Sequence, residues 1–320
     1  MLTSFRLATF TFRLMSKATF ALPAYKGSML RGAFGHTFKR VVCMNRSGTC
    51  RDCAYPETCP YAYIFETPPP DDTAMLRKYP HAPHPYVIEP SLDEQRIYHA
   101  GDALVFRLVL IGKAIDYLPY FIYTFDELAK SGLGRQKGTC VLEEVASPAA
   151  DGVDVVIFSG AQRVFRNLYR VVRMADIQEQ AKAHAGRETL TLTFHTPTRL
   201  TFGGRLVERP EFHMFARTLL RRISTLAYFH CGERLEVDFR GLIDAATRVG
   251  IAESDARWVE LTRYSSRQQT ELMMGGFQGS VTYAGHFDPF LPFLLLGQHV
   301  HVGKGTVYGL GKYVVDEAIG

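Results

Sequence analysis

The chain has 320 residues, of which 47% are hydrophobic and 22% are charged, and its formal net charge is +5 at pH 7. This length allows two domains of ordinary size, and the composition excludes a disordered or fibrous chain. No apolar run reaches the roughly 18 residues that cross a bilayer, and the first residues do not form a signal peptide. We therefore expect a cytoplasmic protein that makes no membrane contact.

In the first half of the chain, the pattern predicts a strand over residues 3–15 and a helix over residues 26–42, where Leu30, Phe34 and Phe38 recur at helical spacing. Residues 67–90 hold seven of the sixteen prolines. Proline fixes φ and removes a backbone donor, so this stretch is predicted to be an extended, poorly structured connection. The other predicted elements of this half are a strand at 103–111, an amphipathic helix at 114–130, and strands at 137–146 and 153–159.

The second half repeats this order of elements. A strand of period 2 is predicted over residues 189–195, and a helix over residues 210–229 carries an apolar stripe on one side. The elements predicted after it are a helix at 233–250, strands at 257–264 and 276–283, a short helix at 288–296, a strand with His299 and His301 on one face, and a terminal strand at 312–315. Helices interleaved with antiparallel strands predict an α+β domain that is present twice.

Positive charge is concentrated in the first 60 residues. They hold nine lysines and arginines against two acidic residues, an excess of seven, which is larger than the net charge of the whole chain. A basic face of this kind attracts a polyanion. An ordinary solvated surface has the same composition, so both interpretations stay open.

Four cysteines lie within seventeen residues, with the spacing C-x6-C-x2-C-x5-C: Cys43, Cys50, Cys53 and Cys59. Such a density in a chain expected to be cytoplasmic favours a metal site over disulfides. Four thiolates can close a tetrahedral zinc site or hold an iron–sulfur cluster. We favour structural zinc, with an iron–sulfur cluster or unligated thiols as alternatives. A closed site of four thiolates has no open coordination position, so its expected role is stability and not catalysis.

His36 is the best histidine candidate for acid–base chemistry. It lies roughly 200° around the predicted helix from the apolar stripe. Lys39 and Arg40, its i+3 and i+4 neighbours, share its face. Gly32 and Gly35 are expected to leave room there for a backbone to approach. An imidazole beside two cations suits proton transfer near a phosphate, because the cations stabilise developing oxyanion charge. The alternative is a basic helix surface without chemistry.

Near the end of the chain, Gly303–Tyr313 reads GKGTVYGLGKY. Its glycines can adopt positive φ, and a run of exposed amide groups suits phosphate oxygens. Nucleotide-binding loops stand between a strand and a helix, whereas this loop precedes a terminal strand. The sequence therefore argues against a Rossmann or Walker loop. It predicts a loop that packs against an extended phosphodiester or against a neighbouring element.

These motifs together resemble a known family. The tail Gly303–Tyr313 resembles the C-terminal glycine-rich loop of the CRISPR precursor-RNA-processing endoribonucleases of the RAMP superfamily. The segment Leu30–Arg40, followed by Cys43 and by Cys59–Thr67, resembles the N-terminal part of the branch that carries a cysteine cluster. Pro83–Pro90 is a further match. The matches bracket nearly the full chain in the right order.

The resemblance implies two tandem ferredoxin-like domains of the βαββαβ type, with RNA lying between them. The first would cover residues 1–180, with a cysteine-rich insertion at 43–59 and the proline-rich loop at 67–90. The second would cover residues 187–320 and carry the glycine-rich tail.

The resemblance also implies metal-independent cleavage within CRISPR repeat RNA, without a catalytic cofactor. The ribose 2′-hydroxyl attacks the adjacent phosphate and leaves a 2′,3′-cyclic phosphate and a 5′-hydroxyl. In several relatives the acid–base histidine lies on the first helix, which maps onto His36, with Tyr25 and Lys39 as supporting groups. The tail departs from many relatives, which have five residues between the glycine pairs where this chain has three.

The implied partners are CRISPR repeat RNA, mature crRNA and other subunits of a CRISPR effector complex. The residues expected to contact RNA are Arg31, Arg40, Arg217, Arg221, Arg222, Gly303, Lys304, Gly305, Gly309, Gly311 and Lys312. An alternative function is a guide-RNA-binding RAMP subunit that does not cleave. A third account is a metal-dependent protein in which the cysteine cluster is the working centre.

Overall fold

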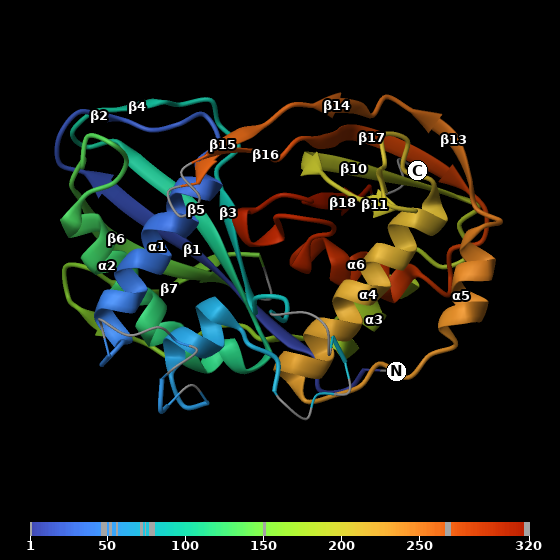
Figure 1. The fold of residues 1–320 in the computed structure, drawn as a ribbon, viewed down its shortest axis with the longest axis horizontal. Coiled ribbons are helices and arrows are strands. Elements are labelled where there is room, and N and C mark those ends of the chain that lie inside the picture. The colour runs from blue at the N-terminus through green and yellow to red at the C-terminus, as the bar shows by residue number, and fades with distance from the viewer. Residues whose placement is uncertain are drawn as a thin grey trace. The chain divides into compact units, whose positions relative to one another are not determined.

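The structure is a computed structural model that describes residues 2–45, 50, 53–55, 57–70, 73, 75–76, 81–149, 152–265 and 270–316. Two compact units make up the chain (Figure 1). The N-terminal unit consists of Arg6–Val172 and Phe229–Cys231, and the C-terminal unit of Met1–Phe5, Arg173–Tyr228 and Gly232–Gly320. The division therefore falls earlier in the chain than the expected boundary between residues 180 and 187.

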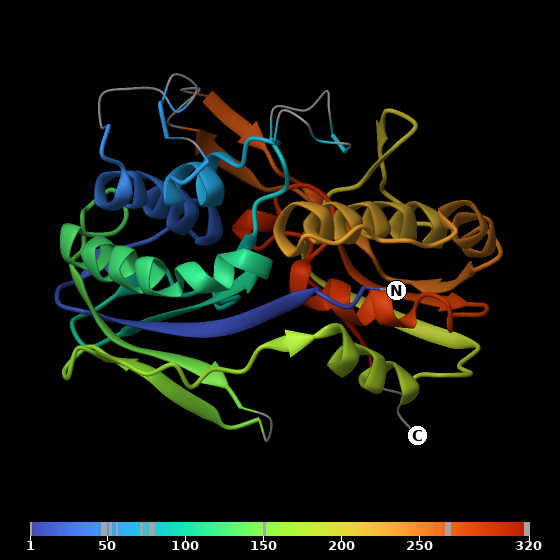
Figure 2. The same ribbon diagram turned by 90° about the horizontal axis from the view of Figure 1, so that it is seen from below.

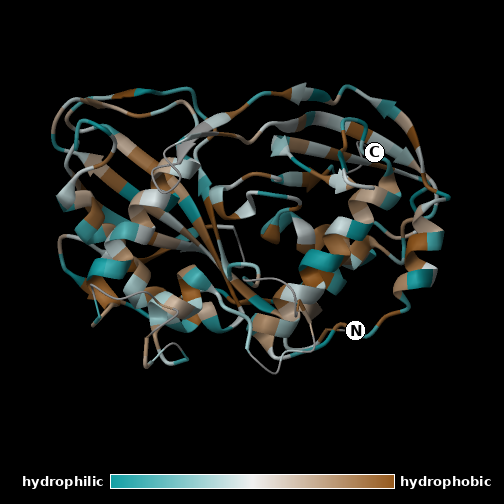
Figure 3. Ribbon diagram, viewed as in Figure 1, coloured by the Kyte–Doolittle hydropathy of each residue, from teal (hydrophilic) through white to brown (hydrophobic). Residues whose placement is uncertain are grey.

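The N-terminal unit is built on one sheet with the strand order β3-β5-β1-β6-β7-β8, and β9 also pairs with β1. The strands are β1 Arg6–Ser16, β3 Tyr86–Pro90, β5 Ala103–Ile111, β6 Cys140–Pro148, β7 Asp154–Ser159, β8 Val164–Phe165 and β9 Val172–Arg173, and a separate short pair joins β2 Phe20–Ala21 to β4 Ile97–Tyr98. In β1, the buried residues Phe10, Phe12 and Leu14 alternate with less buried neighbours. Hydrophobic and hydrophilic residues also alternate along strands of this sheet (Figure 3). One face of the sheet therefore carries the core.

Two helices, α1 (Gly27–Val42) and α2 (Leu118–Ser131), pack together on one side of β1 (Figure 2). A 3₁₀ turn, η2 (Gly112–Tyr117), leads into α2, and a π-helical turn, η1 (Ala62–Glu66), follows the cysteine segment. Phe34 of α1 stacks on Phe121 of α2 with ring centroids 4.9 Å apart, and Phe12 of β1 contacts Phe125 at the same distance. Aromatic packing thus fixes α1 against the sheet.

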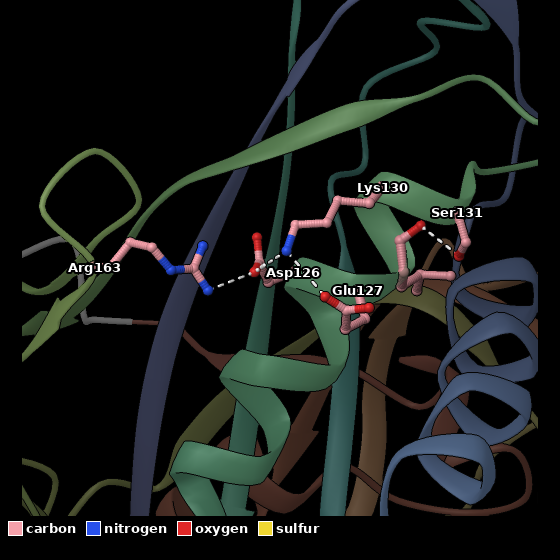
Figure 4. A network of polar contacts seen from close by, with 6 residues as sticks. Asp126, Glu127, Lys130, Ser131 and Arg163 are labelled. Carbon is pink, nitrogen blue, oxygen red and sulfur yellow. Dashed lines mark hydrogen bonds and ion pairs between the residues drawn. The ribbon is translucent and has the colours of Figure 1, made fainter.

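The buried carboxylate of Asp126 joins α2 to the turn between β7 and β8 (Figure 4). Its Oδ2 accepts hydrogen bonds from Lys130 Nζ at 2.8 Å and from Arg163 Nη2 at 3.0 Å. Lys130 also donates to Glu127 Oε1 at 2.9 Å, and these hydrogen bonds raise the pKa of Lys130. Two cations therefore compensate a carboxylate whose burial alone would be unfavourable.

The C-terminal unit has a sheet with the order β13-β17-β10-β18, and β14 pairs with β17. Its strands are β10 Thr189–Thr198, β13 Gly250–Ser254, β14 Arg257–Val259, β17 Gly276–Ala284 and β18 Tyr313–Val315, and its helices are α3 Met174–Lys182, α4 Phe212–Cys231, α5 Phe239–Ala246 and α6 Leu291–Val300. Two small hairpins, β11 Thr201–Phe202 with β12 Arg205–Leu206 and β15 Thr262–Ser265 with β16 Thr270–Met273, and the 3₁₀ turn η3 Thr306–Tyr308 complete it.

Both α4 and α6 lie on one face of this sheet (Figure 1). Phe215 of α4 contacts Phe194 of β10 and Tyr313 of β18, with centroids 5.7 Å and 5.2 Å apart. The Tyr313 hydroxyl donates to the Leu294 carbonyl of α6 at 2.7 Å. The last strand of the chain is thus bound into the core by both helices.

The two units share one topology. In each unit, the main elements follow along the chain as strand, helix, strand, strand, helix, strand. When these four strands are numbered along the chain, they lie side by side in the sheet as second, third, first and fourth. This is the ferredoxin-like βαββαβ arrangement. The predicted tandem ferredoxin-like fold is confirmed, although no literal sequence repeat marks the duplication.

Three expectations for individual segments were wrong. Residues 86–90, within the predicted unstructured connection, form the fully buried strand β3 at the edge of its sheet, where flanking prolines are tolerated. The helix expected at 233–250 is limited to α5. His299 and His301 do not lie on a strand, because α6 continues to Val300 and His301 ends it with a φ of 61°. Within the described residues, no helix is both long and apolar enough to cross a membrane.

Candidate active site

Helix α1, which carries His36, begins at an ion pair between a buried lysine and an exposed aspartate. Lys26 precedes its first residue and is fully buried, and Lys26 Nζ donates to Asp93 Oδ1 at 2.9 Å. Partial burial raises the pKa of Asp93, but hydrogen bonds, including that from Lys26, outweigh it and leave this pKa below its ordinary value. The pair connects the start of α1 to the chain that follows β3.

One side of α1 is covered by η1. Phe65 fills the space beside Gly35, where an added Cβ would lie 2.0 Å from the ring. The Arg31 guanidinium carbon lies 3.9 Å from the centroid of the same ring, and Lys39 Nζ lies 5.9 Å from the centroid of Tyr61. Gly35 is therefore required by packing and does not leave the free space that the sequence suggested.

A hydrogen-bond network holds Arg31 in this position. Thr67 Oγ1 donates to the Ala82 carbonyl at 3.0 Å, so it accepts from His84 Nδ1 at 3.2 Å. His84 Nε2 then accepts from Arg31 Nη2 at 3.4 Å. The network fixes one tautomer of His84 and fastens η1 to α1. Sequence reasoning missed His84 and Phe65, because each lies thirty or more positions from the α1 residue that it contacts.

The opposite side of α1 is open. Ser28, Gly32, His36 and Arg40 follow at four-residue spacing, which places them along one side of the helix. Gly32, His36 and Arg40 are exposed, and a Cβ added to Gly32 would meet no atom within 4 Å. A glycine inside a helix costs about 1 kcal/mol relative to alanine. Packing does not account for Gly32, and its missing side chain leaves clear space beside His36.

The two predicted supporting groups do not share this open side. Tyr25 precedes α1, and His36 lies nine positions after Gly27, a rise of about 14 Å along the helix axis. Burial first, and the Glu89 carboxylate second, raise the pKa of Tyr25 far above its usual value. Lys39 is half-buried against Tyr61. The structure thus brings Arg40, and not Tyr25 or Lys39, beside His36.

The arginines predicted on α4 differ from one another. Arg217 and Arg221 are exposed. Arg222 Nε donates to the Val300 carbonyl at 2.7 Å, and burial lowers the pKa of Arg222 to about 9. A cation at this position also interacts favourably with the C-terminal end of α6. Arg222 therefore supports α6, whereas Arg217 and Arg221 remain candidates for RNA contact.

All four glycines of the tail, Gly303, Gly305, Gly309 and Gly311, have positive φ between 72° and 87°. An added Cβ at Gly311 would lie 1.8 Å from the Val302 carbonyl oxygen, and one at Gly303 would lie 2.6 Å from that of Arg199. The Lys304 amide donates to the same Arg199 carbonyl at 3.0 Å. Gly303 and Gly311 are thus needed for close packing against neighbouring backbone, while the side chain of Lys304 is exposed.

The four clustered cysteines are free and half-buried. Burial, Glu66, Cys43 and Cys59 all raise the pKa of Cys50, against the opposing effect of Lys39. Among the described residues, however, no three His, Cys, Asp or Glu side chains are grouped around one ion position. Residues 46–49, 51–52 and 56 of this segment lie outside the described residues. The metal site stays a prediction from cysteine spacing.

The open side of α1 has the chemistry of an acid–base site for a phosphodiester. A histidine can take or give a proton near neutral pH, and an arginine one turn away can stabilise charge on phosphate oxygens. Gly32 allows an extended backbone to approach closely. Transfer of a phosphodiester from one oxygen to another requires groups of these kinds.

Comparison with known proteins gives the family. The model AF_1859_N, an N-terminal domain, matches residues 5–169, which nearly coincide with the main segment of the N-terminal unit. The model described as CRISPR-associated endoribonuclease Cas6 matches residues 192–313 of the C-terminal unit. No curated protein matches the chain significantly.

Solved structures agree with this assignment at the level of the fold. A product complex of the Cas6 protein TTHB231 from Thermus thermophilus has a TM-score of 0.61 at 17% identity, over 97% of this chain and 99% of that one. A partial Cas6-RT-Cas1–Cas2 complex has a TM-score of 0.63 at 14% identity, over 98% of this chain and 46% of that one. A histidine-to-alanine mutant of the Cas6 protein TTHA0078 has a TM-score of 0.51 at 17% identity, over 98% and 99%. The two family models together span most of both units, and the second places the C-terminal unit in the Cas6 family of CRISPR-associated endoribonucleases.

Proposed function

We propose that this protein cleaves CRISPR repeat RNA to release mature crRNAs, without a metal ion in the reaction. The observation that carries the proposal is the exposed His36, with Arg40 one turn away and open space at Gly32, in a chain whose C-terminal unit matches the Cas6 family. Relatives of the same fold support it, since one was solved as a product complex.

The reaction is a transesterification. The 2′-oxygen of one ribose forms a bond to the adjacent phosphorus, the bond from phosphorus to the 5′-oxygen breaks, and a 2′,3′-cyclic phosphate and a 5′-hydroxyl result. One proton leaves the 2′-hydroxyl and one reaches the departing 5′-oxygen. His36 serves as general acid or base in this exchange. Arg40 stabilises the additional charge on the phosphate oxygens as the pentavalent transition state forms.

Binding of the RNA is a separate task in this proposal. The exposed Lys304 in the glycine-rich tail and the exposed Arg217 and Arg221 on α4 contact phosphates of the repeat. Contacts to phosphates read the shape and backbone of the RNA rather than its sequence. The Cas6 domains found in complexes with Cas1 and Cas2 support association of the present chain with further CRISPR proteins.

The test is substitution of His36. His36→Ala is expected to lower the single-turnover cleavage rate of the repeat RNA by about 10²- to 10⁴-fold, the usual contribution of a general acid or base. RNA affinity should stay within a few fold of wild type, because His36 is not the main phosphate contact. His99→Ala, which alters another exposed histidine of the same unit, is the matched control and should cleave normally.

Two outcomes would contradict the proposal. Full activity of His36→Ala would remove His36 from the mechanism. Tight binding of repeat RNA by a wild-type protein that never cleaves it would favour the alternative, a guide-RNA-binding RAMP subunit.

A further inference from the structure

A small hairpin in the C-terminal unit projects from its surface. Gly203 and Gly204 form the turn between β11 and β12 with φ values of 57° and 79°, the pair of positive φ angles that a type I′ turn requires. All six residues from 201 to 206 are exposed, and an added Cβ at either glycine would meet no atom within 4 Å. At the base, the buried residues Leu200 and Val207 are joined by a backbone hydrogen bond of 3.1 Å. The hairpin thus joins the core of the unit at its base.

An aromatic ring is held in a fixed position on this hairpin. Phe202 is 38% exposed. Its ring centroid lies 5.3 Å from that of His213 at an angle of 82°, and 5.9 Å from the guanidinium carbon of Arg217. His213 and Arg217 are one turn apart on α4. Phe202 is thus oriented by two contacts, although much of its apolar surface remains in water.

The surroundings of Phe202 are basic. Residues 199–206 include Arg199 and Arg205 and no acidic residue, and the twenty residues of α4 contain none either. Arg205, Arg217 and Arg221 are all exposed. Two glutamates, Glu208 and Glu211, follow the hairpin in the chain, and the Glu211 carboxylate lies 3.6 Å from His213 Nδ1.

We infer that this surface, made of Phe202, Arg205, Arg217 and Arg221, binds single-stranded RNA. An exposed aromatic ring stacks on bases of any sequence, and arginines around it contact the phosphates on either side. No internal packing role explains an exposed phenylalanine on a glycine turn, and the positive charge around it favours a polyanion and disfavours a basic partner surface. The inference rests on the proposed function, in which the substrate is an RNA with single-stranded segments.

The experiment measures binding of a fluorescein-labelled oligouridine, which has no stem, by fluorescence anisotropy. Phe202→Ala should weaken binding roughly tenfold, the effect of losing one stacked base, whereas Phe202→Trp should bind like wild type. Arg205→Ala should reduce the slope of log affinity against log salt concentration by about 0.7, the value for one phosphate contact on a single strand.

Matched controls lie in the same unit. Phe239 is 39% exposed and Arg248 is exposed. Phe239→Ala therefore tests the loss of an exposed aromatic ring elsewhere, and Arg248→Ala tests the loss of an exposed charge. Both variants should bind oligouridine like wild type. If Phe202→Ala binds as tightly as Phe239→Ala, the inference is wrong. If Phe202→Ala binds RNA normally but no longer associates with another CRISPR protein, the surface is a protein interface and the RNA assignment is wrong.

Cleavage of repeat RNA, measured on the same preparations, separates this inference from the proposed function. A wild-type protein that cleaves, with unchanged RNA binding in Phe202→Ala, contradicts the hairpin surface alone. A wild-type protein that does not cleave, with weakened oligouridine binding in Phe202→Ala, contradicts the proposed function and supports the surface.

Discussion

Gly32 and Gly35 differ in role, although they are only three residues apart on α1. The space beside Gly35 is filled by Phe65, and the space beside Gly32 is empty. A helix residue that lowers stability without a packing reason suggests a requirement from a ligand. In the proposed site, Gly32 provides clearance for the RNA backbone next to His36.

Gly32→Ala should therefore separate stability from activity. We expect the free energy of unfolding to rise by up to about 1 kcal/mol, because alanine is the better helix former. Cleavage of repeat RNA should slow severalfold, because a methyl group enters the approach of the backbone. Gly35→Ala should instead destabilise by about 1–3 kcal/mol, since its Cβ collides with Phe65. Thermal unfolding and cleavage rates check both, and wild-type cleavage by Gly32→Ala would remove the proposed role of Gly32.

Glu233 acts on the stability of the C-terminal unit. Its carboxylate accepts hydrogen bonds from the Thr3 amide at 2.8 Å and the Ser4 amide at 2.7 Å. Partial burial raises the pKa of Glu233, but these hydrogen bonds outweigh it and leave the pKa below its ordinary value. The carboxylate thereby holds residues 3–4, and the neighbouring Leu2 and Phe5 are buried.

Glu233→Ala should lower the free energy of unfolding by about 1–2 kcal/mol near pH 7. A pKa lowered in the folded state gives stability that is present above the unfolded-state value, about 4.3, and is lost as the pH falls through the folded-state value. The difference between wild type and variant should therefore shrink at acidic pH. Denaturant unfolding at pH 7 and at pH 3.5 measures it, and a constant difference would contradict the assignment.

At the scale of elements, the segment after α1 combines packing with an expected metal site. Its C-terminal part covers α1 through Phe65 of η1 and through Tyr61, which precedes η1. We propose that Cys43, Cys50, Cys53 and Cys59 bind one structural zinc ion through four thiolates, which would fasten the segment at its other end. The metal would supply stability and no step of the RNA chemistry.

Elemental analysis of the purified protein should find one zinc per chain. Cys50→Ser combined with Cys53→Ser should remove the metal and lower the melting temperature, because a structural metal contributes folding free energy. Cys231→Ser changes a cysteine outside the cluster and should keep the zinc. Iron together with visible absorbance would identify an iron–sulfur cluster, and a metal-free protein of unchanged stability would leave the thiols unligated.

At the scale of the whole molecule, periodicity predicted most elements and the duplicated α+β fold. The strand at 103–111 coincides with β5, and the order of elements implied two similar domains. What could not be predicted depends on partners distant in the sequence. Phe65 fills the space at Gly35, and the Val300 carbonyl accepts the hydrogen bond from Arg222. The sequence pattern around Gly35 or Arg222 does not indicate either of these partners. The exposure of His36 could be predicted, because it follows from helical geometry alone.

The central claim is cleavage of RNA by its own 2′-hydroxyl. The most direct measurement incubates purified protein with end-labelled repeat RNA in EDTA and determines the product ends. We predict one defined cut that leaves a 2′,3′-cyclic phosphate and a 5′-hydroxyl, and no cut when the nucleotide at the mapped position lacks its 2′-hydroxyl. Products with a 3′-hydroxyl and a 5′-phosphate, or cleavage that requires a divalent metal, would contradict the account.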